Sequence, residues 1–309
     1  MRVTHGTIEQ GSGPLALTIG NFDGVHLGHR AMLERVAAAA HDRGMSSCAL
    51  TFEPHPREFF APALAPARLT RLREKLELIA EAGIERTHVL RFDAALASLA
   101  AQRFVDEVLV RGLGVRWLVV GRDFRYGAKR AGDFAALEAS AARHGFALEA
   151  MPEVADCGTR VSSSAVRAAL AAGNLALAAR LLGRPYSMSG RVAHGDRLGR
   201  RLGFPTANIV LRRRAPLAGI YVVEAELEET RERLRGVASV GRRPTVRRDA
   251  APLLEVHLFD FDAPLYGRHL RVRFLRKLRD EQKYEGLEAL RAAIAGDAAR
   301  AREYFTEHG

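Results

Sequence analysis

Residues 20–29, with the sequence Gly-Asn-Phe-Asp-Gly-Val-His-Leu-Gly-His, combine glycine and histidine at a spacing that suits phosphate binding. They follow an apolar run and precede a helical pattern. A turn between a strand and a helix start presents backbone N–H groups and the positive end of the helix dipole to an anion. Gly24 and Gly28 lack a Cβ, so a phosphate can come close; His26 and His29 add neutral or cationic donors. The alternative is an ordinary strand-to-helix turn with two surface histidines.

A serine run later in the chain suits the same anion chemistry. Ser162, Ser163 and Ser164 stand where a helix is expected to begin, and Arg167 follows one turn later. Serine hydroxyls cap the free N–H groups of a helix start, and the arginine can reach the same anion. Simple helix capping is the alternative interpretation.

Two loops follow predicted strands in the first half. Residues 121–127 contain Asp123 and Phe124 beside arginines and a tyrosine, a mixture that suits a planar ligand carrying phosphate. Residues 52–56 contain two prolines, which predict an extended loop around His55. An ordinary connecting loop is the alternative in both places.

The second half has a glycine-rich run at residues 190–208 that ends in a hydroxyl and an amide. Glycines let such a loop fold over a polyphosphate, and side-chain oxygens suit Mg²⁺. The residues concerned are Gly195, Gly199, Thr206 and Asn208. Glu255, inside an apolar strand pattern, is the candidate base; an outward-facing surface carboxylate is the alternative.

The elements that must position these residues alternate through the first half. Strand-like apolar runs occur at 15–19, 47–52, 87–92, 117–120 and 147–151. Helical patterns separate them, and Gly44, Gly83 and Gly145 stand where a left-handed residue ends a helix. The alternation predicts a parallel sheet with helices on both faces, whose ligands bind beyond the carboxyl ends of the strands. We expect His26 and His29 to lie at these carboxyl ends.

The pattern changes around residues 183–185. Before this point lie two short predicted helices, at 164–172 and 175–182. After it, strand-like runs occur at 189–193, 219–226, 234–240, 253–261 and 269–275, followed by a helical pattern at 286–295. The second half therefore predicts an antiparallel barrel or sandwich with a C-terminal helix. We expect one domain at 1–184 and another at 185–309.

Composition limits the class of protein. The formal net charge of +11 is carried almost entirely by arginine in an alanine-rich chain. Its densest cluster, 212–214, lies in a predicted loop, so we expect no nucleic-acid partner. Cys48 and Cys157 are the only cysteines, too few for a disulfide framework or a cysteine metal cluster. Without a signal-like segment or an uncharged apolar stretch of ~18 residues, the sequence predicts a cytoplasmic protein without a membrane span.

Taken together, the motifs resemble the bacterial bifunctional riboflavin kinase/FAD synthetase family over almost the whole chain. The resemblance depends on the order of several motifs rather than on one. They are residues 20–29, 52–56, 121–127, 161–167, 183–186, 203–208, 240–246 and 255–261. The resemblance implies an N-terminal Rossmann-like FMN adenylyltransferase (FAD synthetase) domain and a C-terminal barrel like that of riboflavin kinases.

In the barrel, the resemblance implies phosphorylation of riboflavin by ATP to give FMN and ADP. ATP and Mg²⁺ then bind under the glycine-rich loop that contains Gly195 and Gly199. Thr206 and Asn208 contact the metal and the phosphates. Glu255 takes the proton of the ribityl 5′-hydroxyl as this oxygen attacks the γ-phosphate.

In the first domain, the resemblance implies that FMN attacks the α-phosphate of a second ATP, so that FAD forms and pyrophosphate leaves. His26 and His29 then stabilise charge on the phosphate oxygens during transfer. Asp123 and Phe124 contact the flavin or substrate. The residues implied at the ATP phosphates and the departing pyrophosphate are Gly24, Gly28, Ser162, Ser163, Ser164 and Arg167.

Three positions depart from the family pattern. Ser164 stands where a threonine is usual, and Tyr126 where a phenylalanine is usual. Asp123 stands where some relatives have asparagine, which leaves the metal and substrate contacts of the first site open.

Two other functions remain open. One is an adenylyltransferase for another substrate, such as pantetheine or nicotinamide mononucleotide, with an accessory barrel; it leaves residues 190–208 and Glu255 unexplained. The other is a basic nucleic-acid- or ligand-binding protein without turnover, which predicts salt-sensitive binding and no consumption of ATP. The sequence leaves the oligomeric state undetermined.

Overall fold

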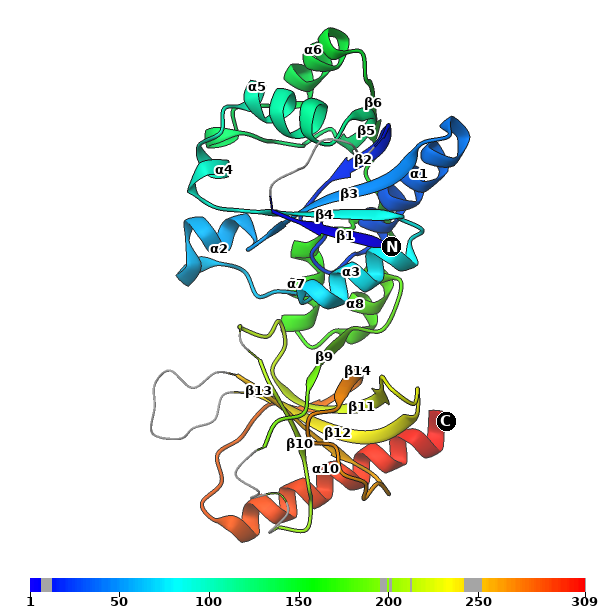
Figure 1. Ribbon diagram of the computed structural model, residues 1–309. Coiled ribbons are helices and arrows are strands. Elements are labelled where there is room, and N and C mark those ends of the chain that lie inside the picture. Colours follow the sequence, from blue (N-terminus) through cyan, green and yellow to red (C-terminus); the bar gives the residue numbers. More distant parts are fainter. Residues whose placement is uncertain (7–12, 195–198, 200–201, 212, 242–251, 309) are drawn as a thin grey trace. The chain divides into compact units, whose positions relative to one another are not determined.

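The structure is a computed structural model that describes residues 1–6, 13–194, 199, 202–211, 213–241 and 252–308 (Figure 1). Their packing forms two compact units. The first consists of residues 1–66 and 70–162, and the second of residues 67–69 and 163–309. The domain boundary expected after residue 184 stays a prediction.

The first unit contains the predicted parallel sheet, in the order β1-β4-β3-β2-β5-β6. Five of its strands coincide with the predicted apolar runs; β1 was missed because its four residues Arg-Val-Thr-His have little apolar pattern. The strands are β1 (Arg2–His5), β2 (Leu15–Ile19), β3 (Ser46–Glu53), β4 (Arg86–Arg91), β5 (Val115–Gly121) and β6 (Ala147–Met151). A short hairpin follows, formed by β7 (Ala155–Asp156) and β8 (Thr159–Arg160).

Helices cover both faces of this sheet (Figure 1). Leu15 and Leu17 of β2 pack against η2 (Phe104–Gly112), a π-helical segment, and α6 (Phe134–His144). Ala16 packs on the opposite face against α1 (Leu27–Arg43) and α3 (Leu72–Glu81). The shorter helices are α2 (Pro56–Phe60), η1 (Pro62–Leu64), α4 (Ala94–Ser98), α5 (Ala101–Arg103) and η3 (Ala128–Arg130).

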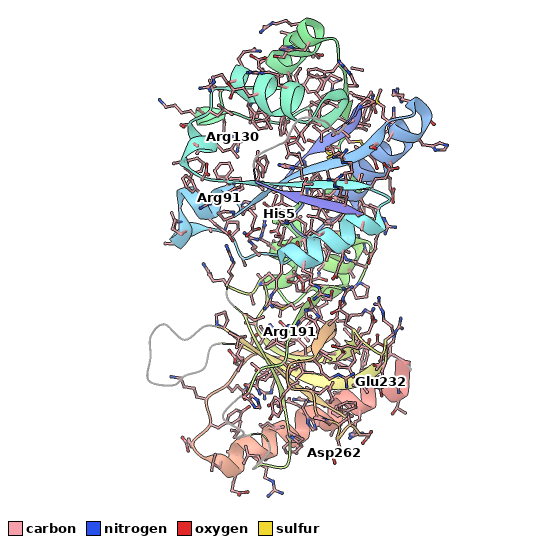
Figure 2. All side chains as sticks on the ribbon, viewed as in Figure 1. His5, Arg91, Arg130, Arg191, Glu232 and Asp262 are labelled. Atoms are coloured by element: carbon pink, nitrogen blue, oxygen red, sulfur yellow. The ribbon has the colours of Figure 1, made fainter. Side chains whose placement is uncertain are left out.

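The strand order creates a switch point at β2. Its neighbour on one side is β3 and on the other β5, so the chain leaves the carboxyl ends of β2 and β5 in opposite directions along the sheet. Ligands of open parallel sheets bind in the crevice at such a point. The predicted loops at 20–29 and 121–127 both begin there. Figure 2 shows His5 and Arg91 at the carboxyl ends of β1 and β4, on the same edge of the sheet.

The second unit begins with α7 (Ser163–Ala171) and α8 (Leu175–Leu182) and continues into an antiparallel sheet in the order β10-β13-β12-β11-β14-β9. A bridge between Ala193, just after β9, and Asn208 of β10 nearly closes this sheet into a barrel. The strands are β9 (Ser187–Arg191), β10 (Ala207–Val210), β11 (Gly219–Leu227), β12 (Arg233–Gly241), β13 (Leu253–Leu258) and β14 (His269–Arg279). The sequence pattern missed the four-residue β10.

Apolar side chains fill both the inside of the barrel and the side that a helix covers. Inside, Tyr221 and Phe274 pack edge to face at 5.3 Å, and burial raises the pKa of Tyr221 to about 12. Outside, α10 (Leu287–His308) packs Ala301 and Phe305 against Val222 of β11. This helix extends 13 residues beyond the predicted end at residue 295, because alanines carry its apolar face and they give a weak hydrophobic signal.

Candidate functional site: two phosphate sites

The loop after β2 carries two stacked histidines. His26 is the N-cap of α1; its Nδ1 accepts a hydrogen bond from the backbone N–H of His29 at 3.3 Å. The two imidazole rings stack with centroids 3.6 Å apart and an angle of 17° between their planes. Gly24, with a φ of 85°, supplies the left-handed turn that precedes them. The predicted turn therefore places both rings at the positive end of α1.

Gly28 allows a close approach on the same side of α1. A Cβ added there would lie 3.3 Å from His26 Nδ1 and 3.7 Å from the carbonyl oxygen of Val161. The segment that leads into Ser162 thus lies beside the histidine turn within the first unit. Ser162 is half-buried.

Ser163, Ser164 and Arg167 belong to the second unit, in the first turns of α7. Ser163 is half-buried and Ser164 is exposed. Arg167 Nε donates a hydrogen bond to the carbonyl oxygen of Ala67, 2.7 Å away. Their joint action with the histidines on one pyrophosphate stays a prediction.

Asp123 and Phe124, in the loop after β5, have different surroundings. Asp123 is exposed and forms an ion pair with Arg160 of β8, with an N–O distance of 2.6 Å. Phe124 is half-buried, stacks on Tyr126 with a centroid distance of 5.6 Å and packs against the core of the sheet. A contact of either residue with substrate stays a prediction.

The extended loop predicted at 52–56 is confirmed around His55, whose φ and ψ are −60° and 136°, although it is short because β3 ends at Glu53 and α2 begins at Pro56. His55 caps the short helix α2: its Nδ1 accepts from the N–H of Arg57 at 3.1 Å, and its own N–H donates to Glu58 at 3.2 Å. Proline at the first position of a helix is compatible with helical geometry, and Pro56 occupies that position. The sequence pattern did not reveal this capping box because it is formed by a histidine.

Four aromatic residues that the sequence analysis did not identify form a cluster on and beside α2. Phe59 and Phe60 make edge-to-face contacts with each other and with Phe92, which in turn contacts Phe52. Phe60 is 66% exposed. The neighbouring phenylalanines in a short polar segment could have indicated this cluster, because exposed neighbouring aromatics often mark a binding surface.

In the barrel, Asn208 and Glu255 lie opposite each other in the register of β10 and β13. Asn208 is 6% exposed, and its Nδ2 donates to the carbonyl oxygen of Thr206 at 3.2 Å. Its Oδ1 is buried without a hydrogen-bond partner among the residues that the structure describes. A buried carbonyl oxygen left in this way fits a cation ligand.

Glu255 is half-buried and has Ser239 of β12 on its other side. A second carboxylate lies nearby: Glu281 packs against Gly241, the last residue of β12. Burial raises the pKa of Glu281, and the charge of Glu255 raises it further. Glu281 was not among the predicted site residues; it lies in the charged run that directly follows β14.

The second unit also has a cavity of about 200 Å³. Thr206 and Asn208 line it together with Pro205 and the loop after β13, which includes Asp262 (Figure 2) and Tyr266. Tyr266 stacks on His194 with a centroid distance of 3.9 Å. The sequence indicated Thr206 and Asn208 but missed the loop residues, which lack a recognisable motif.

The glycine-rich run is described in part. A side chain on Gly199 would collide with the carbonyl oxygen of Phe204 and come within 3.4 Å of Thr206 Oγ1. Glycine is therefore required where the chain turns back toward Thr206. Gly195 lies outside the described residues, as does the part of the 240–246 motif from residue 242 onward.

Comparisons with known proteins match two different families to the two halves of the chain. The family described as FAD synthetase matches residues 9–165, and the family described as riboflavin kinase matches residues 182–305. A bifunctional riboflavin kinase/FMN adenylyltransferase from Escherichia coli (strain K12) is 50% identical over 290 residues, which cover 94% of this chain and 92% of the relative. The chain belongs to this family. The resemblance inferred from the motifs is confirmed.

Other members of the bifunctional riboflavin kinase/FMN adenylyltransferase family are similarly close. Those from Pseudomonas fluorescens and Haemophilus influenzae are 51% and 44% identical, over 92% and 94% of this chain and 91% and 94% of their own lengths. A solved structure named a macrolide-efflux protein, from Streptococcus pneumoniae, matches with a TM-score of 0.81 and 28% identity, covering 98% of this chain and 99% of that one. Among the described residues of the present chain, no helix is both long and apolar enough to cross a membrane.

Proposed function

We propose that the two sites divide the two reactions of the family between them. The chain is a transferase that phosphorylates riboflavin with ATP to give FMN and then adenylylates FMN with a second ATP to give FAD and pyrophosphate. The barrel would perform the first reaction and the parallel-sheet unit the second. The observation that supports this division is the donor chemistry: stacked imidazoles at a helix start in one unit, and a glutamate paired in strand register with a buried asparagine in the other.

In the barrel, Glu255 accepts the proton of the ribityl 5′-hydroxyl. The hydroxyl oxygen forms a bond to the γ-phosphorus of ATP, the bond from that phosphorus to the bridging oxygen breaks, and ADP leaves. Ser239 and Asn208 are its partners in the register of the adjacent strands and would flank this carboxylate. The cavity beside Thr206 is where ATP binds, and Tyr266 and His194 offer flat surfaces to its base.

Thr206 and Asn208 would hold Mg²⁺. The buried Oδ1 of Asn208 fits this role, because Mg²⁺ selects oxygen ligands and an unpartnered buried oxygen is otherwise unfavourable. When bound, the ion neutralises charge on the ATP phosphates. Gly199 would allow the chain to pass close to these phosphates, and Gly195 stays a predicted phosphate contact.

In the parallel-sheet unit, a phosphate oxygen of FMN forms a bond to the α-phosphorus of ATP, and the bond from that phosphorus to the pyrophosphate oxygen breaks. His26 and His29 donate to the phosphate oxygens on which charge accumulates. Gly24 and Gly28 allow the phosphates to approach α1. Ser162 of the same unit would hold the departing pyrophosphate, and this role for Ser163, Ser164 and Arg167 stays a prediction from the sequence.

The flavin would bind at the carboxyl ends of the strands. Asp123 and Phe124 are the predicted contacts, and the exposed rings of Phe59 and Phe60 add an apolar surface suited to a planar ring system. The cytoplasmic location and the lack of a nucleic-acid partner stay predictions from the sequence.

One incubation tests the proposed function. Purified protein is mixed with riboflavin and Mg-ATP, and riboflavin, FMN and FAD are separated by chromatography over time. We expect FMN to appear first and FAD to follow. An adenylyltransferase for another substrate would leave riboflavin unchanged, and a binding protein without turnover would consume no ATP.

A further inference from the structure

The turn before the histidines has an unfavourable backbone conformation that is fully buried. Phe22 and Val25 have φ angles of 47° and 38°, and they are 0% and 2% exposed. Residues with a Cβ rarely occupy this left-handed region, and they remain there where surrounding contacts hold them. The conformation of residues 22–25 sets where His26 begins α1. Contacts that hold this turn therefore also set the position of both imidazoles.

Asp23 and Thr70 make those contacts from positions 47 residues apart. Asp23 Oδ1 accepts hydrogen bonds from Thr70 N at 3.1 Å and from Thr70 Oγ1 at 3.3 Å. Thr70 Oγ1 in turn accepts from the N–H of Gly24 at 3.0 Å. One hydroxyl thus donates to Asp23 and accepts from the next residue along the turn. Both side chains are buried, Asp23 at 3% and Thr70 at 5% exposure.

The helix that follows Thr70 also holds the beginning of the turn. Lys75 of α3 is 2% exposed, and its Nζ donates to Thr51 Oγ1 at 3.3 Å. Thr51 Oγ1 donates to the carbonyl oxygen of Asn21 at 3.3 Å. Thr70 and α3 therefore fix both ends of the segment 21–24 relative to the sheet.

We propose that Asp23 and Thr70 are positioning residues for adenylyl transfer: they hold the buried turn so that His26 and His29 stack at the start of α1. The inference rests on the proposed role of these histidines. Neither residue contacts the reacting atoms in this account. Their effect is on the geometry of the transition state, in which a displacement of about 1 Å at a catalytic group can reduce the rate about 100-fold.

The test compares Thr70→Val with Thr70→Ser in the full-length protein. Valine keeps the shape and removes both hydroxyl contacts, whereas serine keeps them. For conversion of FMN to FAD, we expect Thr70→Val to lower kcat by roughly 10- to 100-fold, with KM for ATP changed less than about threefold. Thr70→Ser keeps kcat within about threefold of the unmodified protein, because the hydroxyl remains. Conversion of riboflavin to FMN by the same samples is unchanged.

Thr4→Val is the matched control. Its hydroxyl lies 2.8 Å from His88 Nδ1 in the same unit, so the variant loses a similar hydrogen bond far from the turn. Trp117, the single tryptophan, is 3% exposed in the core beneath α1, and its fluorescence reports whether this unit is folded. If Thr70→Val is unfolded by this measure, Asp23→Ala replaces it, because alanine removes the oxygen that accepts both hydrogen bonds from Thr70. We then expect the same loss of kcat.

Three outcomes decide the matter. A kcat for FAD formation within twofold of the unmodified protein in folded Thr70→Val, or in folded Asp23→Ala where it replaces that variant, overturns the inference. An equal loss in Thr4→Val also overturns it, because the effect is then one of general stability. A His26→Ala variant tests the proposed function separately from this inference. If it still makes FAD, the proposed role of the histidines fails, whatever the result for Asp23 and Thr70.

Discussion

Asn208 on β10 and Glu255 on β13 face each other directly across an antiparallel pair of strands, 47 residues apart in the chain. This register brings a candidate metal ligand and a candidate base to the same face of the barrel. Opposite residues of an antiparallel pair have Cβ atoms about 4.5–5.5 Å apart. A proton acceptor and an ATP-bound cation can therefore act on one phosphoryl transfer.

Replacement of Glu255 and His26 should separate the two activities. We expect Glu255→Gln to lower FMN formation by about 100- to 10,000-fold, the usual contribution of a general base, while supplied FMN is still converted to FAD. His26→Ala should stop at FMN. Chromatography of both reactions measures this. The exposed residues Glu232 and His41 provide the controls Glu232→Gln and His41→Ala, which leave both reactions intact, and the reverse pattern would contradict the assignment.

Replacement of Asn208 should change the magnesium requirement of the first reaction. Asn208→Ala removes the buried Oδ1, and we expect the half-saturating Mg²⁺ concentration for FMN formation to rise at least about tenfold, as when a group that orients a metal ligand is lost. Titration of the initial rate with Mg²⁺ measures this. Asn174→Ala removes an amide that caps α8; it should lower the free energy of unfolding by ~1 kcal/mol and leave the Mg²⁺ titration unchanged. An unaltered titration in Asn208→Ala would exclude the metal contact.

His88 should make the first unit less stable in mild acid. Its Nε2 lies 3.1 Å from the carbonyl oxygen of Gly6, to which it donates, and burial lowers its pKa below the ordinary value of 6.5. Between these two pKa values the unfolded chain binds the proton more readily, so the contribution of His88 is complete above about pH 6.5 and is lost as the pH falls. Urea unfolding, followed by Trp117 fluorescence between pH 7.5 and 5, measures this.

The variant His88→Gln checks the source of that pH dependence. Glutamine does not titrate in this range, so the slope of unfolding free energy against pH should become shallower than in the unmodified protein. His41→Gln, at an exposed position of α1, should keep the full slope. Equal slopes in His88→Gln and the unmodified protein would assign the effect to other groups.

The C-terminal helix should depend on Asp297. This carboxylate is 4% exposed and forms ion pairs with Arg279 of β14 and Arg300, both at 2.5 Å. Asp297→Ala leaves Arg279, itself 17% exposed, without this partner, and we expect roughly 2–4 kcal/mol of lost stability, somewhat below the range for a fully buried pair. Denaturant unfolding followed by circular dichroism measures the loss. Arg302→Ala breaks the exposed pair with Asp260 and should change stability little.

Most of the candidate site could be read from local sequence. The motif at 20–29 predicted a helix start with two imidazoles, and His26 does cap α1. The two prolines at 52–56 predicted the extended backbone that His55 has, but not the helix α2 that begins at Pro56. Strand β10 was also missed, because four residues are too few to show an alternating pattern.

The sequence by itself determined the kind of chemistry and the order of the elements. Donor types and their spacing are local properties, and so are the periods that distinguish the strands around 15–19 from the helices between them. Only the tertiary structure decided which distant residues meet. Asn208 faces Glu255 because of strand register, and Asp23 reaches Thr70 because α3 packs beside β2. Such contacts depend on burial and backbone pairing between segments far apart in the chain, which no local pattern encodes.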